Sequence, residues 1–325
     1  MAARATRSGG RVAQAHTWGA AALAIGCALA PRIAAADGAV RFEPLATIGA
    51  ESLGSARLNA PAGLSIDHRQ RLFIADAGND RIVVVNAAGR FESEFGRFGS
   101  DDGQFLTPTD VTAREGFFYY VADTENERVQ KFDRFRAFVD IPFERGGQDG
   151  AYGSPRGIEI DDEGRLYVAD TEQHTVWVID SFTGEFRFQI GGFGTQEGRF
   201  DEPIDIAIGP ERSIYVADAG NARVQAFDRL GSFLFAFSGA DSANSFRRPS
   251  AVVYDPRGFV FVADPVAGRV FVTSPRGVLL GALANDALKS PTGLALGSDA
   301  TLFVSDADAH RVRSYRVFLD EAAAD

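Results

Sequence analysis

Short apolar runs separated by polar turns follow one another at regular intervals along residues 40–317. Each repeat contains four runs of four to eight residues that are rich in Val, Ile, Phe and Tyr, with Gly, Asp, Asn or Pro between them. One repeat shows its runs at residues 203–208, 214–218, 223–228 and 233–237. Runs of this length and composition are typical of β-strands, and no stretch beyond residue 36 shows a sustained helical period. The pattern predicts an all-β protein with four strands per repeat.

The repeat is marked by the tripeptide Val-Ala-Asp or a close copy of it. Successive copies lie 47, 47, 48, 46 and 42 residues apart, and each aspartate follows a proline by fifteen residues. The six copies end at Asp76, Asp123, Asp170, Asp218, Asp264 and Asp306. Four-stranded repeats of this length are the blades of β-propellers. We therefore predict a six-bladed β-propeller of four-stranded antiparallel blades.

The last repeat is one strand short, because too few residues follow its third strand at residues 311–317. The segment Phe42–Gly49 ends twelve residues before Pro61, the spacing that also separates Gly96 from Pro108. It therefore matches a displaced fourth strand. We expect this N-terminal strand to pair with residues 311–317, which completes the last blade, closes the ring and covers the exposed strand edges.

Three motifs carry a resemblance to a known family. Pro-x-Gly-Ile-x-Ile-Asp, Leu-Tyr-Val-Ala-Asp and Asn-x-Arg-Val-Gln-x-Phe-Asp resemble NHL repeats, and the resemblance covers about residues 40–317. The pattern departs at Pro265-Val266-Ala267 in the fifth repeat and at Gln173-His174-Thr175 in the third. The resemblance implies a six-bladed propeller but no particular reaction, because NHL propellers serve as protein-binding, RNA-binding and enzymatic scaffolds.

Residues 1–36 differ from the rest of the chain. Three arginines precede an apolar stretch at residues 18–30, and residues 34–36 are three alanines. This order predicts a secretory signal peptide and an exported protein, periplasmic or extracellular, with no transmembrane segment. The alternative is a lipid anchor at Cys27, because Ala-Ile-Gly-Cys faintly resembles a bacterial lipobox.

The expected organisation is a signal peptide (1–36), a closing strand and connection (37–57), six NHL-like repeats and a C-terminal tail (318–325). The repeats span 58–105, 106–152, 153–200, 201–246, 247–288 and 289–317. The leader contains four arginines and no acidic residue, so its removal changes the formal net charge from −11 to −15. Because this charge repels polyanions, no nucleic-acid partner is expected.

The six Val-Ala-Asp aspartates are expected to be structural, because an acid present in every blade serves the blade itself. Each carboxylate can accept backbone N–H groups of the turn and reach an arginine five residues on, as in Asp76 and Arg81. A functional site is expected where one repeat departs from the others.

Six residues show such departures. They are Arg156 directly after its proline, Asp110 and Asp205 two residues after theirs, Glu159 four residues after, and His174 and His310 in the turn between second and third strands. We predict that they form a ligand-binding site at one mouth of the propeller channel, centred on the third blade. For the histidines the alternative is a solvated turn, and for Glu159 it is an internal ion pair.

Two functions remain open. The first is an interaction scaffold that binds a protein or peptide partner, or another ligand, across the mouth. The second is a hydrolase or lyase with no firm cofactor other than a metal such as Ca²⁺, held by Glu159, Asp110 and Asp205 as oxygen ligands. The three-histidine zinc centre of the NHL-like peptide-amidating lyases is not expected, because the histidines beyond the leader lie on different blades and His68 lies at the opposite face.

Overall fold

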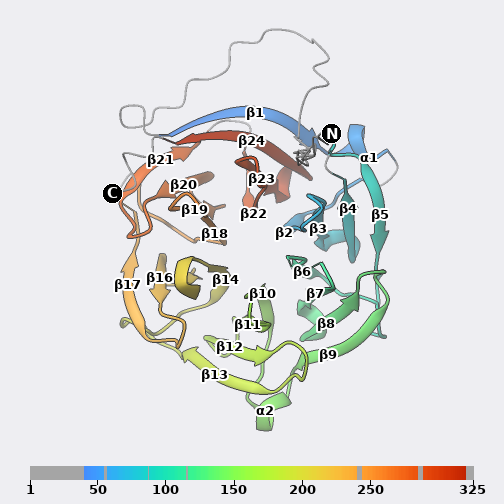
Figure 1. Ribbon diagram of the computed structural model, residues 1–325, viewed down its shortest axis with the longest axis vertical. Helices are drawn as coiled ribbons and strands as arrows, with labels where there is room; N and C mark the ends of the chain where they lie inside the picture. Colours follow the sequence, from blue (N-terminus) through green and yellow to red (C-terminus); the bar gives the residue numbers. More distant parts are fainter. Residues whose placement is uncertain are drawn as a thin grey trace, which may run out of the picture.

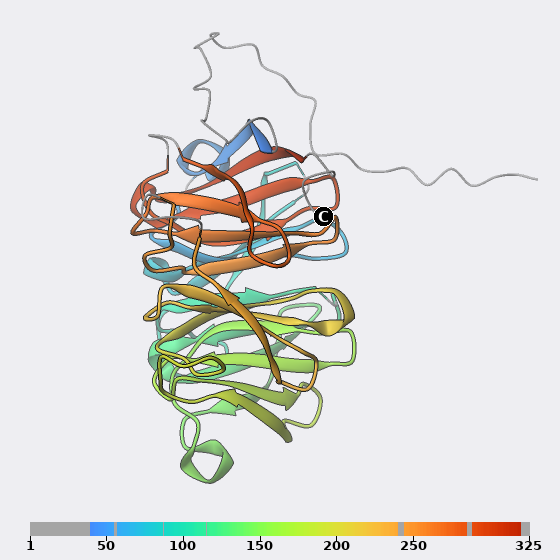
Figure 2. The same cartoon turned by 90° about the vertical axis from the view of Figure 1, so that its left-hand side faces the viewer.

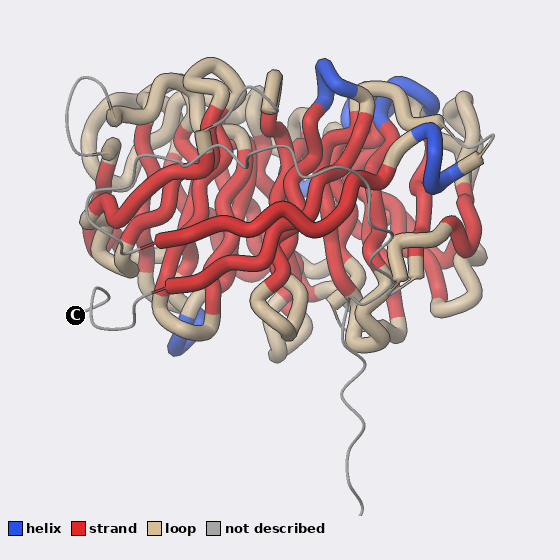
Figure 3. Tube along the Cα trace, turned by 90° about the horizontal axis from the view of Figure 1, so that it is seen from above, coloured by secondary structure: helices blue, strands red, loops and turns tan. Residues whose placement is uncertain are grey.

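The chain folds into six four-stranded antiparallel sheets arranged around a central axis (Figure 1). The computed structural model describes residues 40–319 except 55–56, 87, 115, 240–243 and 285–287. Seen from the edge, the sheets form a flat ring whose strands run between two faces (Figures 2 and 3). The predicted six-bladed β-propeller is confirmed.

Five blades are continuous in sequence, and the sixth combines both ends of the described chain. The continuous blades are β2 (Pro61–Ile66), β3 (Leu72–Asp76), β4 (Arg81–Val85), β5 (Phe91–Phe95); β6 (Pro108–Thr112), β7 (Phe118–Asp123), β8 (Arg128–Asp133), β9 (Phe138–Glu144); β10 (Pro155–Ile160), β11 (Arg165–Asp170), β12 (Thr175–Asp180), β13 (Phe186–Gly191); β14 (Pro203–Ile208), β15 (Ile214–Asp218), β16 (Arg223–Phe227), β17 (Phe233–Phe237); β18 (Ala251–Asp255), β19 (Phe259–Asp264), β20 (Arg269–Thr273), β21 (Leu279–Leu283). The sixth is β22 (Pro291–Leu296), β23 (Thr301–Asp306), β24 (Arg311–Leu319) and β1 (Val40–Ile48). Short helical turns are α1 (Ala50–Leu53), α2 (Gly147–Gly150), η1 (Ala77–Asn79), η2 (Thr124–Asn126), η3 (Pro210–Arg212) and η4 (Ala307–Ala309).

The burial of each strand follows its place in the blade. The second strands β3 and β19 are buried at every position, because neighbouring blades cover both of their faces. The outermost strand β17 alternates between exposed and more buried residues, because only one of its faces packs on the protein. Aromatic rings fill the space between blades, as where Phe73 and Tyr119 lie 4.7 Å apart between the first and second blades.

The ring closes through the two ends of the described chain. β1 pairs antiparallel with β24, with Phe42 opposite Val317 and Ile48 opposite Val312. A bulge follows Pro44, and a proline is tolerated here because β1 is an edge strand on which one side of the ladder is unpaired. The predicted closure is confirmed.

Each Val-Ala-Asp aspartate lies buried at the end of a second strand. Asp76 accepts the backbone N–H of Asn59 at 2.6 Å and the Nε–H of Arg81 at 2.8 Å. In the third blade, Trp177 Nε1 donates to Asp170 at 2.9 Å in place of the arginine. We call the face that bears these turns the upper face; the turns between first and second strands and between third and fourth strands lie on the lower face.

Candidate functional site

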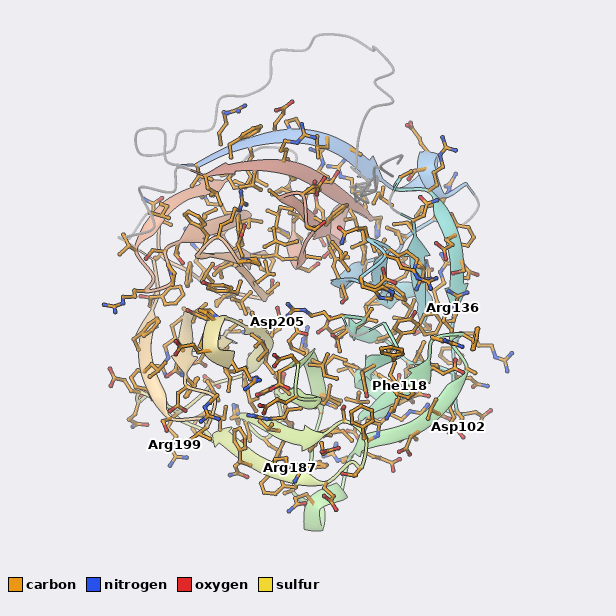
Figure 4. The ribbon with its side chains drawn as sticks, in the orientation of Figure 1. Asp102, Phe118, Arg136, Arg187, Arg199 and Asp205 are labelled. Atoms are coloured by element: carbon orange, nitrogen blue, oxygen red, sulfur yellow. The ribbon has the colours of Figure 1, made fainter. Side chains whose placement is uncertain are left out.

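The innermost strands of the six blades line a central channel with a volume of about 570 Å³. Each of these strands begins at the upper face, so residues next to the prolines lie at the upper mouth of the channel. The lower mouth is lined by residues of the turns that follow these strands, including His68, Arg114 and Arg257. Figure 4 shows side chains around this axis and labels Asp205 beside it.

Arg156 lines the channel at the upper mouth, directly after Pro155. Among the described residues, none forms a hydrogen bond or an ion pair with its guanidinium group. The neighbouring Arg248 and Glu202 instead pair with each other at 2.5 Å. Solvent reaches the Arg156 side chain, yet the channel wall displaces enough water to lower its pKa, and the positive charge of Arg248 acts in the same direction. An unpaired, partly desolvated guanidinium is a receptor for an anionic group.

Asp110 and Asp205 lie one layer deeper, on the second and fourth blades. Asp110 Oδ2 accepts the backbone N–H of Ile158 from the third blade at 2.8 Å. Asp205 Oδ2 accepts the N–H of Val252 from the fifth blade at 2.8 Å. Each carboxylate therefore ties the innermost strands of two neighbouring blades together.

The two aspartates are perturbed electrostatically. Burial raises the pKa of Asp110 well above its usual range, and the negative charges of Asp205 and Glu159 raise it further. Burial also raises the pKa of Asp205 to about 7, with Glu159 acting in the same direction. These two carboxyls therefore retain protons at pH values where an exposed aspartate is fully ionised.

Glu159 lies further down the channel than Arg156. Its Oε1 accepts a hydrogen bond from Thr112 Oγ1 at 3.2 Å, and its Oε2 pairs with Arg114 Nη1 at 3.2 Å. Arg114 belongs to the turn at the lower end of β6, so the ion pair lies towards the lower mouth. Glu159 thus combines the two interpretations made from the sequence, since it is ion-paired and also lines the channel.

The structure does not bring His174 and His310 to the channel. Both adopt the left-handed conformation in the turns between second and third strands, with φ of 53° and 50°. The Nδ1 atoms accept backbone N–H groups of the next blade, from Glu202 at 3.0 Å for His174 and from Ala60 at 3.0 Å for His310. Asp80 makes the equivalent bond in the first blade. The expectation that the two histidines lie around the channel mouth is therefore corrected. Their side chains instead connect each turn to the neighbouring blade.

Two features of the channel escaped the sequence analysis. Gly63 and Gly157 occupy the position equivalent to the aspartates on the first and third blades. A Cβ on Gly63 would lie 2.7 Å from the Cα of Asp110, and a Cβ on Gly157 would lie 2.6 Å from the Cα of Asp205. Glycine and aspartate alternate at the second position after the proline in the first four repeats, and this alternation could have indicated the close contact. Nothing in the repeat pattern marked Arg114 as the partner of an acid 45 residues away.

Residues 40–319, outside the gaps given above, show neither a metal-binding cluster nor a membrane-spanning helix. In this part of the chain no group of three or more His, Cys, Asp or Glu side chains is placed to hold a metal ion. No helix there is long and apolar enough to cross a membrane. The proposed leader and Cys27 lie outside the described residues.

The fold and its channel define a six-bladed β-propeller with an open axis. The family model for the NHL repeat matches residues 152–179 and 200–227. The match covers segments of the third and fourth blades and, together with the six four-stranded blades, supports an assignment to the NHL-repeat family. A comparison with curated proteins finds no significant match.

Several solved structures share the fold at low sequence identity. The gluconolactonase XC5397 from Xanthomonas campestris is 15% identical with a TM-score of 0.63, covering 90% of this chain and 100% of that one. A catalytically inactive variant of virginiamycin B lyase from Staphylococcus aureus with quinupristin is 12% identical with a TM-score of 0.59, covering 84% and 85%. A chain of a nidogen/laminin complex is 15% identical with a TM-score of 0.59, covering 72% and 84%. These similarities concern the fold alone.

Proposed function

We propose that this protein is an exported interaction propeller that binds a protein or peptide partner across the upper mouth, through an acidic group held by Arg156. The observation that carries the proposal is the unpaired guanidinium at the channel entrance. The other arginines that line the channel, Arg114 and Arg257, are paired with Glu159 at 3.2 Å and Asp255 at 2.6 Å. A guanidinium can bind a carboxylate through two parallel hydrogen bonds, so it favours an acidic side chain or a chain terminus.

Exposed aromatic side chains on the upper face support a polypeptide partner. Phe98 and Phe193 occupy equivalent positions in two connections between blades and are 72% and 71% exposed. Their loops are held by backbone hydrogen bonds, such as Phe105 N–H to Arg97 O at 2.8 Å. Fixed aromatic residues and arginines are the side chains that dominate protein interfaces.

Export is part of the proposal and comes from the sequence of residues 1–36. Mass spectrometry of the protein recovered from its native host tests it, with the new N-terminus expected close to Asp37. A diacylated Cys27 would establish the lipid-anchored alternative, and a chain that retains its leader would contradict export altogether.

An enzymatic function is the second candidate, favoured by the carboxyl of Asp205. A buried acid whose pKa is about 7 can exchange a proton at neutral pH, as a general acid or base does. Glu159, Asp110 and Asp205 would then serve a hydrolase or lyase, with Ca²⁺ as the metal to test. Elemental analysis of the purified protein, followed by lactone and lyase substrates, separates this candidate from the scaffold.

The binding proposal is tested with an array of acidic peptides and neutral counterparts in which Asp and Glu are replaced by Asn and Gln. Wild-type protein should prefer the acidic set, and Arg156→Ala should reduce affinity about tenfold or more, because a buried charged hydrogen bond is lost. Arg156→Lys should retain part of it. Arg136→Ala, on the lower face, is the matched control. Unchanged binding by Arg156→Ala would contradict the proposal.

A further inference from the structure

The lower face carries a row of protruding apolar side chains, which we call the apolar rim: Phe117, Phe135, Phe182 and Leu230. They are between 60% and 71% exposed. Phe117 lies in the turn between the first and second strands of the second blade, and the others lie in the turns between third and fourth strands of the second, third and fourth blades. Because all of these turns are at the same end of antiparallel strands, the four side chains belong to one face.

The rim residues are held in position by their turns. Asp133 Oδ1 accepts the N–H of Phe135 at 2.8 Å, and Asp180 Oδ1 accepts the N–H of Phe182 at 2.9 Å. Asp228 Oδ1 accepts the corresponding N–H of the fourth blade at 2.9 Å. These bonds fix the backbone that projects Phe135, Phe182 and Leu230, so little conformational entropy is lost when these three side chains are covered.

The second and third blades also join beneath the rim. The rings of Phe118 and Phe182 lie 6.2 Å apart. The Nζ of Lys131 lies 4.3 Å from the Phe118 ring and 5.2 Å from the Phe182 ring. The buried ammonium group of Lys131 therefore places a positive charge next to the aromatic rings of this part of the face. Figure 4 labels Phe118 and Arg136, which both belong to the second blade.

Arginines flank the rim on the first and second blades. The guanidinium of Arg134 lies 4.7 Å from the ring of Phe135. Among the described residues, no ion pair engages the side chains of Arg69, Arg90, Arg134 and Arg136, although the whole chain has a formal net charge of −11. The lower face of the first and second blades therefore presents local positive charge beside the exposed rings of Phe117 and Phe135, against the overall charge of the molecule. On the third and fourth blades the acids Asp162 and Glu163 pair with Arg212.

We propose that the lower face docks on an anionic lipid bilayer, with the apolar rim in the interface and the flanking arginines at the phosphate headgroups. The rim consists of convex tips on separate turns. A fluid bilayer accepts such tips individually, whereas a folded protein partner would need a matching pocket for each. Arginines near the surface add attraction to anionic lipids. In this orientation the upper mouth with Arg156 faces away from the membrane and stays free, so the inference extends beyond the proposed function without depending on it.

Flotation with vesicles tests the docking. Vesicles of phosphatidylcholine alone are compared with vesicles that contain about 30% phosphatidylglycerol, and the wild-type protein should float with the anionic ones and be released as salt is raised. Phe135→Ser and Phe182→Ser should each lower the partition coefficient about tenfold, because an apolar side chain no longer leaves water. Arg134→Gln should lower it about fivefold.

The chain supplies a matched control, because the dipeptide Arg-Phe also occurs on the upper face at Arg97-Phe98. Arg97→Gln and Phe98→Ser should leave flotation unchanged, and thermal melting should show that every variant is folded at the temperature of the assay. Equal losses from both faces would overturn the proposal. A wild-type protein that does not float with anionic vesicles would also overturn it. The proposal would fail in the same way if the lower-face variants lost binding to a protein partner and the wild type did not bind vesicles. Equal flotation with both vesicle types, insensitive to all variants, would indicate an acyl anchor and also overturn it.

Discussion

The sharpest prediction concerns the charge of Asp205 in the channel wall. Replacing it with Asn keeps a carbonyl oxygen that can accept the N–H of Val252 and removes the ionisable group. In the unfolded chain an aspartate ionises near its ordinary pKa, whereas the folded protein holds this proton until the pH reaches about 7. Between these pH values the folded state binds more protons, so stability falls as the pH rises through this window and remains lower above it.

The magnitude follows from the shift. The pKa of Asp205 rises from 3.8 to about 7, and at 1.36 kcal/mol per pH unit this corresponds to about 4 kcal/mol. Water in the channel screens part of the interaction, so about 2 kcal/mol is the effect expected in practice. Asp205→Asn should match the wild type at about pH 3, below both pKa values, and exceed its unfolding free energy by about 2 kcal/mol at about pH 8.

Urea unfolding followed by fluorescence at several pH values between about 3 and 8 measures this difference. Part of the wild-type slope should persist in the variant, because the pKa of Asp110 is also raised. Asp102→Asn, at an exposed position, is the control and should leave the profile unchanged. Parallel profiles for the wild type and Asp205→Asn would refute the reasoning.

Three further predictions concern the ring itself. His310→Ala should lower the free energy of unfolding by about 1 kcal/mol, because the Ala60 N–H loses its acceptor. His310→Asp should recover most of this loss, as Asp80 makes the same bond in the first blade. Chemical denaturation measures both variants, and equal losses would contradict this role of His310. Gly157→Ala should destabilise by about 2 kcal/mol, because its Cβ would lie 2.3 Å from a backbone oxygen of the next blade; an unchanged melting temperature would oppose this. Deletion of residues 37–50 removes β1 and should lower the melting temperature by about 10 °C or more and promote association through β24, so a monomeric deletion variant with unchanged melting would contradict the closure argument.

The blade architecture was predictable because its signals are local and repeated. Strand length, apolar composition and turn residues recur with each copy, so six weak signals reinforce one another. The closing strand could also be predicted, since its spacing to Pro61 equals the spacing inside complete repeats. Arg156 and the two channel aspartates were found as departures from this pattern, and the structure brings these three to the channel.

The partners of the candidate residues could not be predicted in the same way. His174 and His310 were grouped with Arg156 because their turns lie on the same face as the prolines, but their hydrogen bonds run to the next blade. The partner of Glu159, Arg114, comes from a neighbouring blade. Such contacts depend on the rotation of one blade relative to the next. The spacing of the repeats in the sequence contains no information about this rotation.

By itself, therefore, the sequence determined the number of blades, the four strands in each and the closure of the ring, because these follow from a spacing and alternation that recur along the chain. Only the tertiary structure decided which side chains share the channel, which aspartates are buried there, and which of the channel arginines has no partner among the described residues. The physical reason is that desolvation and charge pairing depend on atoms from different blades meeting at the axis. Residues separated by a whole repeat become neighbours there, and their energies are set by that proximity.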